Sequence, residues 1–68
     1  MKISKNLATL HSGGYKAQAQ REAENLSIWT EQNWKDESTL FGFADGSAIY
    51  TCGPEFREAT PSEIMAAA

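Results

Sequence analysis

Apolar residues recur at helical spacing in the segment that follows Ser12-Gly13-Gly14. Four of them share one helical face at i, i+4, i+8 and i+11, whereas lysine, glutamine, arginine and glutamate fill most positions between them. A serine ahead of such a stripe is a typical N-cap, and Asn25 is a suitable end. The pattern predicts a helix over residues 13–25 whose apolar stripe is Tyr15, Ala19, Ala23 and Leu26.

A hairpin follows further along the chain. Asp45-Gly46 separates two strand-like runs rich in aromatic and β-branched residues, at positions 40–44 and 47–52. An Asp-Gly pair in this setting is typical of a two-residue type I′ turn, because both central positions of that turn need positive φ. Such a turn fixes the register of the two strands, and it predicts that Phe41 lies opposite Tyr50.

The C-terminal third predicts a chain that leaves the sheet and ends in a helix. Gly53-Pro54 ends the hairpin, because proline cannot continue an inner strand, and the segment from Phe56 fits a short edge strand. Thr60-Pro61-Ser62-Glu63 is a capping box with proline at the first helical position. The short helix that it opens is marginal alone, so it either docks through Ile64 and Met65 or frays.

The beginning of the chain fits two interpretations. Ile3, Leu7 and Leu10 stand at helical spacing, but the run before the glycine pair also fits a strand that leads into the helix. We favour a strand at residues 5–11, and residues 27–33 form another strand-like run. The expected fold class is therefore α+β: one small domain over residues 1–68, with an antiparallel β-α-β-β-β sheet, one main helix packed on one face and a short C-terminal helix.

The predicted register gives this sheet apolar side chains on both faces. Phe41 and Tyr50 share the face that suits the alanine stripe of the main helix, and one helix covers one face. The other face needs the terminal helix, a second copy of the chain or a foreign partner as its cover. Tryptophan is enriched at binding hot spots. We therefore expect a partner-binding surface formed by Leu40, Ile49, Trp34 and Trp29.

Composition favours an outside source of support. A chain of 68 residues has a thin margin of stability, and its single cysteine and single histidine provide neither an intramolecular disulfide nor a zinc site. Self-association or docking on a larger protein remains. A lone cysteine and no apolar leader lead us to expect a cytoplasmic location, and the chain has no apolar run that would span a membrane.

Charge leaves a second class of partner open. All nine acids lie from Glu22 onwards, whereas the first 21 residues hold four of the six basic residues: Lys2, Lys5, Lys16 and Arg21. This basic third could bind nucleic acid. Ser12, Gly13, Gly14 and Lys16 also suggest a weak anion site, because they form a glycine-rich helix start with a lysine in the first turn. The acidic remainder suggests a further alternative, an acidic mimic of nucleic acid.

Catalytic chemistry has little support in the sequence. His11 and Cys52 are the sole nucleophile–base pair, and Cys52 on a strand of the aromatic face would behave as a small hydrophobe. We therefore expect no enzyme, no cofactor, no metal site and no small-molecule substrate. The hypothesis is a protein–protein interaction module, self-associating or inhibitory towards a larger protein, of the kind found among small accessory proteins of phages and mobile elements.

Overall fold

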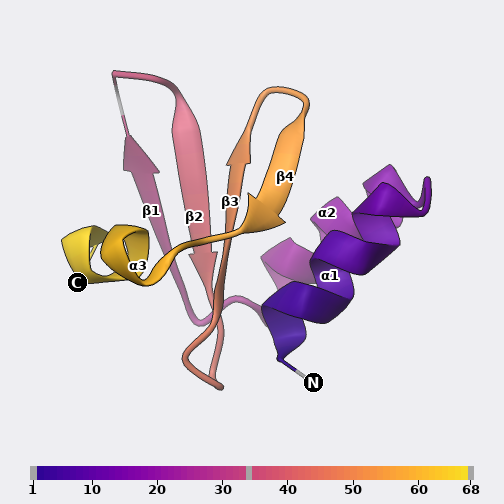
Figure 1. The fold of residues 1–68 in the computed structure, drawn as a ribbon, viewed down its shortest axis with the longest axis horizontal. Helices are drawn as coiled ribbons and strands as arrows, with labels where there is room; N and C mark the ends of the chain where they lie inside the picture. The colour runs from indigo at the N-terminus through magenta and orange to yellow at the C-terminus, as the bar shows by residue number, and fades with distance from the viewer. Residues whose placement is uncertain (1, 34, 68) are drawn as a thin grey trace.

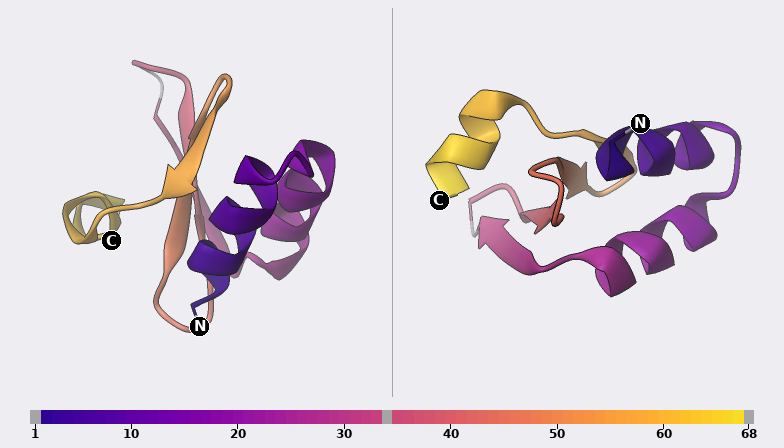
Figure 2. Two further views of the ribbon diagram at one scale, coloured as in Figure 1. Left: turned by 45° about the vertical axis from the view of Figure 1, so that its right-hand side comes forward. Right: turned by 90° about the horizontal axis from the view of Figure 1, so that it is seen from below.

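The sheet lies between two layers of helix in the computed structural model, which describes residues 2–33 and 35–67 (Figure 1). Four antiparallel strands follow in the order β1-β2-β3-β4. Two helices cover one face and a short helix lies on the other (Figure 2). The α+β class is confirmed, whereas the β-α-β-β-β order is wrong. The elements are α1 (Ile3–Ser12), α2 (Lys16–Leu26), β1 (Trp29–Asn33), β2 (Ser38–Gly42), β3 (Ala48–Cys52), β4 (Glu55–Glu58) and α3 (Pro61–Ala67).

The hairpin between β2 and β3 has a three-residue loop instead of the expected two-residue turn. The Phe43 N–H donates to the Ser47 carbonyl, and the Gly46 N–H donates to the Phe43 carbonyl, which closes a type I turn. Gly46 then adopts a φ of 86°, the left-handed conformation of a G1 bulge. The extra loop residue shifts the register by one position, so that Phe41 lies opposite Ile49.

This shift changes which side chains share a face. A slip of one residue turns the side chains of one strand to the other side of the sheet. Ile49 now joins Phe41 beneath the paired helices and is 0% exposed. Tyr50 lies opposite Leu40 on the face of α3. The prediction that Leu40 and Ile49 share one surface is therefore wrong.

The loop adopts this conformation because Asp45 has two sets of partners. One carboxylate oxygen accepts the N–H and the hydroxyl of Ser47, which holds the tight loop. The other accepts the Ile3 N–H at 2.8 Å, at the first turn of α1. The Ser47 hydroxyl oxygen in turn accepts the Ser4 N–H at 3.2 Å. The β2–β3 loop thus caps a helix that lies 42 positions away in the sequence.

Residues 3–12 form this helix, so the predicted strand at residues 5–11 is wrong. The alternative interpretation of the same pattern, helical spacing, is the one that the structure adopts. Four apolar side chains of α1 pack into or against the core: Ile3, Leu7, Ala8 and Leu10. The cap from Asp45 supplies what the local sequence lacks, because Lys2 at the N-cap position makes no side-chain capping bond.

Ser12-Gly13-Gly14 ends α1 and does not begin α2. The Tyr15 N–H donates to the Leu10 carbonyl and the Gly14 N–H donates to the His11 carbonyl, which are the two bonds of a Schellman motif. Gly14 has the φ of 99° that this motif needs. Ser12 is the last residue of α1 and Tyr15 is the N-cap of α2, so the predicted capping role of Ser12 is wrong.

The core lies between the helix pair and the sheet. Ala19 and Ala23 of the predicted stripe are both 0% exposed, which lets α2 approach the aromatic side chains closely. Tyr15 and Leu26, at the two ends of the stripe, are exposed instead. The buried cluster consists of Leu7, Ala19, Ala23, Phe41, Phe43, Ile49 and Phe56.

The capping box predicted at the start of α3 is confirmed. The Glu63 N–H donates to Thr60 Oγ1 at 3.2 Å, and the Thr60 N–H donates to Glu63 Oε1 at 2.8 Å. The helix itself has no buried residue: Ile64 is partly buried and Met65 is 78% exposed. Apolar packing therefore contributes little to its position, and polar contacts hold it.

Candidate partner-binding groove

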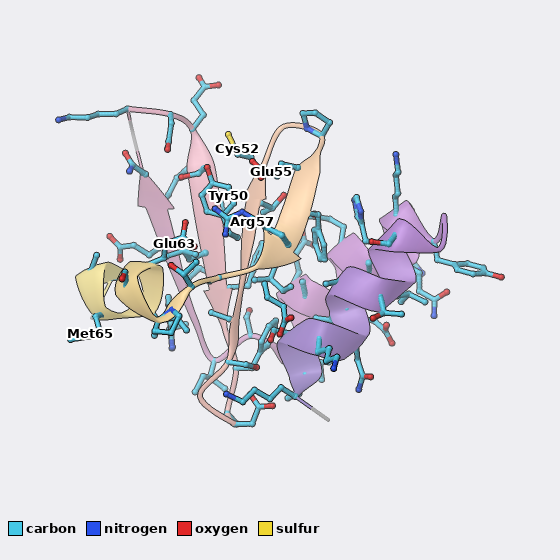
Figure 3. All side chains as sticks on the ribbon, in the orientation of Figure 1. Tyr50, Cys52, Glu55, Arg57, Glu63 and Met65 are labelled. Atoms are coloured by element: carbon cyan, nitrogen blue, oxygen red, sulfur yellow. The ribbon has the colours of Figure 1, made fainter. Side chains whose placement is uncertain are left out.

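Arg57 of β4 fastens α3 to the sheet, and Figure 3 shows it between Tyr50 and Glu63. Its two terminal nitrogens donate to the two carboxylate oxygens of Glu63 at 2.8 and 2.9 Å, a bidentate ion pair. Its Nε donates to Glu55 at 3.2 Å. The hydrogen bonds from Arg57 lower the pKa of Glu63 to about 2, and those from Glu63 raise the pKa of Arg57.

The Tyr50 ring packs against the Arg57 guanidinium. The Arg57 guanidinium carbon lies 4.1 Å from the centroid of the Tyr50 ring, within cation–π range. Burial, with a smaller contribution from a hydrogen bond with Cys52, raises the pKa of Tyr50. The three side chains join β3, β4 and α3 into one polar cluster.

A groove lies between this cluster, the first two strands and α3. It has a volume of about 640 Å³ and is open to solvent. Leu40 and Tyr50 contribute the sheet side, Ala66 and Ala67 of α3 contribute one wall, and residues 31–33, 35 and 36 contribute the other. We call it the α3 groove. It combines an apolar base with a polar rim, the usual layout of a protein-binding surface.

The loop that forms the rim is held by its own hydrogen bonds. Asn33 Oδ1 accepts the Lys35 N–H at 2.9 Å, and Asp36 Oδ1 accepts the N–H and hydroxyl of Ser38. These bonds from Ser38 lower the pKa of Asp36. Cys52 Sγ donates to the Asp36 carbonyl at 3.2 Å, which ties the loop to β3. These bonds fix the described residues of the rim relative to β2 and β3.

Acidic side chains dominate the charge of the α3 groove. Glu31, Asp36 and Glu63 line it, and Lys35 is the one basic lining residue in the described part of the chain. Arg57 lies beside the groove, but its guanidinium is already bonded to Glu55 and Glu63. The groove therefore carries unneutralised negative charge from Glu31 of β1 and Asp36 of the loop.

The predicted partner-binding residues do not stay together. Leu40 lines the α3 groove, whereas Ile49 lies in the core on the opposite face. Trp29 is partly buried and packs against Gly42, where a Cβ would collide with the indole. Trp34 lies outside the described residues. That Leu40 binds a partner stays a prediction, whereas burial in the core removes Ile49 from any such surface.

The predicted anion-binding residues are only partly brought together. Gly14 and Lys16 line a shallow hollow at the start of α2, which Arg21 also lines, and α2 has no side-chain N-cap there. Ser12 and Gly13 belong to the end of α1 and do not line it. Cations beside a helix start are a common surface feature, and nucleic-acid binding stays a prediction.

His11 and Cys52 lie on opposite faces of the sheet. His11 stacks on Phe56 beneath the helix pair, with ring centroids 4.5 Å apart. Cys52 bonds to the loop of the α3 groove. The sheet between them prevents a nucleophile–base pair. Across residues 2–33 and 35–67, no three metal-binding side chains gather, and no helix is long and apolar enough to cross a membrane.

Sequence reasoning missed the Tyr50–Arg57–Glu63 cluster, although one signal was present. The capping box singles out Glu63, but its carboxylate also accepts from Arg57, a partner that no local motif indicates. Tyr50 was assigned to the helix face through the register error. Comparisons with models of protein families, with curated proteins and with solved structures find no match.

Proposed function

We propose that this protein is a non-catalytic interaction module that binds a larger protein through the α3 groove. The observation that supports the proposal is the partly buried Leu40–Tyr50 base, which lies open beside a helix with no fully buried side chain. The core beneath α1 and α2 closes without that base. The groove therefore contributes area that the fold does not use.

A foreign partner suits this groove better than a second copy of the chain. The protein has a net charge of −3. Glu31 and Asp36 line the groove beside Lys35, whereas the third lining acid, Glu63, is already paired with Arg57. Two copies that met groove to groove would place like charges against one another in a partly desolvated interface. A partner with basic groups around an apolar residue meets the same surface without that cost.

Matched variants test this proposal. Leu40→Asn changes the base of the groove, and Tyr15→Ser changes an exposed side chain at the helix layer as a control. The wild type and both variants are used to capture proteins from the native host's lysate. Candidate partners are the proteins that bind the wild type and Tyr15→Ser but do not bind Leu40→Asn. Each is then purified and titrated by calorimetry, with circular dichroism to show that the variants fold.

The expected result is a purified partner whose affinity falls at least about tenfold with Leu40→Asn and changes little with Tyr15→Ser. Equal affinity of both variants would refute the groove as the binding site. Binding that instead disappears with Lys16→Ala plus Arg21→Ala, and that falls steeply with salt, would identify a nucleic-acid binder.

A further inference from the structure

The outer edge of β1 has no neighbouring strand in the described chain. β1 stands at one end of the sheet order, and Thr30 to Asn33 are exposed. At the other end α1 packs against β4. Every second residue of an edge strand directs its N–H and C=O away from the sheet, so such an edge is a template for one more strand.

β1 lacks most of the features that normally block such pairing. Its five residues pair with β2 without a bulge, and none of them is proline or lysine. Glu31 at its centre is the one charge. Antiparallel pairing of two copies in the register that uses the whole strand places Glu31 opposite Glu31, and like charges directly opposite are destabilising. The edge therefore favours another sequence over its own.

The two sides of β1 differ in what they offer to an added strand. Glu31 lies opposite Leu40 and lines the α3 groove with it. Thr30 lies opposite Phe41, on the helix side, and Ile28 just before β1 is 66% exposed. Because side chains alternate along a strand, one side of an added strand lies beside acids and the other beside Thr30 and Ile28.

We propose that the free edge of β1 pairs with an extended segment of the partner protein in which basic residues alternate with apolar ones. This inference rests on the proposed function and names the form of its partner. A lysine or arginine across from Glu31 comes within the 4.5–5.5 Å Cβ spacing typical of cross-strand pairs. Asp36 lines the same groove, so a second basic residue on that side also meets an acid.

Short synthetic peptides that alternate lysine with valine test the inference, and peptides that alternate glutamate with valine are the control. Titration of the ¹⁵N-labelled full chain with the lysine peptide should shift the NMR signals of the backbone amides of residues 28–33. Titration with the glutamate peptide should not shift them. Glu31→Lys should weaken lysine-peptide binding by about tenfold and improve glutamate-peptide binding, whereas Glu24→Lys, on an exposed part of α2, should change neither much.

Backbone pairing has its own signature. Methylation of the peptide nitrogens at all lysines, or at all valines, removes the N–H groups of one edge, so one methylated peptide should lose binding and the other should keep it. Equal binding of both methylated peptides, or shifts centred on β4 or on the helices, would overturn the inference. A concentration-dependent dimer whose protected amides lie in β1 would overturn it as well, because the occupant would then be a second copy.

The natural partner separates this inference from the proposed function. A partner whose binding is lost with Leu40→Asn but unchanged with Glu31→Lys would leave the α3 groove as the binding site and refute strand addition at β1. A partner sensitive to both variants supports both statements.

Discussion

Ile49 and Leu40 provide a direct test of the register of the central hairpin. The observed register buries Ile49 completely against Phe41, whereas Leu40 lines an open groove. The expected two-residue turn would have put the two residues on the same face. Replacing each with alanine in the same background therefore measures which side of the sheet holds the core.

The magnitudes follow from burial. Truncation of a fully buried isoleucine costs about 3 kcal/mol, because a cavity adds to the lost transfer free energy. Leu40 leaves no closed cavity, so its truncation costs about 1 kcal/mol. A chain of this length has a total stability of roughly 3–10 kcal/mol. At about 7 °C per kcal/mol, the melting temperature should fall by about 20 °C for Ile49→Ala and about 7 °C for Leu40→Ala.

Thermal and urea unfolding of the two variants, followed by far-ultraviolet circular dichroism, give the comparison. Two-state unfolding with an unchanged m-value is needed for the free energies to be compared. Equal losses for the two variants, or a larger loss for Leu40→Ala, would refute the observed register and the assignment of the core to the helix side.

Three further outcomes are expected. Gly14→Ala should cost about 1 kcal/mol in urea unfolding, because Gly14 has a φ of 99°, whereas Gly13→Ala, at a φ of −78°, should cost less. The pKa of Asp45 is lowered to about 2, chiefly by its hydrogen bond from Ser47. Its contribution to stability is therefore present above the ordinary pKa of 3.8 and is lost as the pH falls towards 2. Asp45→Asn should consequently make the melting temperature depend less on pH between these two values. Arg57→Met should speed amide exchange in residues 62–67 and leave the exchange of β2 and β3 unchanged. Equal acceleration throughout would contradict the role given to Arg57.

Features with local causes could be predicted from the sequence. Ala19 and Ala23 define the buried face of α2 because helical spacing is a property of a short segment. The box at Thr60 and Glu63 works because its two hydrogen bonds span three residues. Leu40 was placed at a surface outside the core, where the α3 groove now lies.

Features with distant causes could not be predicted in the same way. The first helix has apolar residues at helical spacing, but its capping carboxylate comes from Asp45, far along the chain. The same aspartate, through its other oxygen and Ser47, holds the three-residue loop that changed the register. The groove depends on Arg57 meeting Tyr50 and Glu63, which brings together two strands and a helix. Neither arrangement leaves a periodic pattern in the sequence.

The two oxygens of Asp45 make the folding of the two layers interdependent. An isolated ten-residue helix is marginal in water, so α1 depends on its packing against the core and on the cap that this carboxylate supplies. The hairpin, in turn, keeps its tight loop through the other oxygen of the same group. Sheet and helix layer should consequently unfold in one cooperative transition, and a fragment that omits either would be largely unstructured.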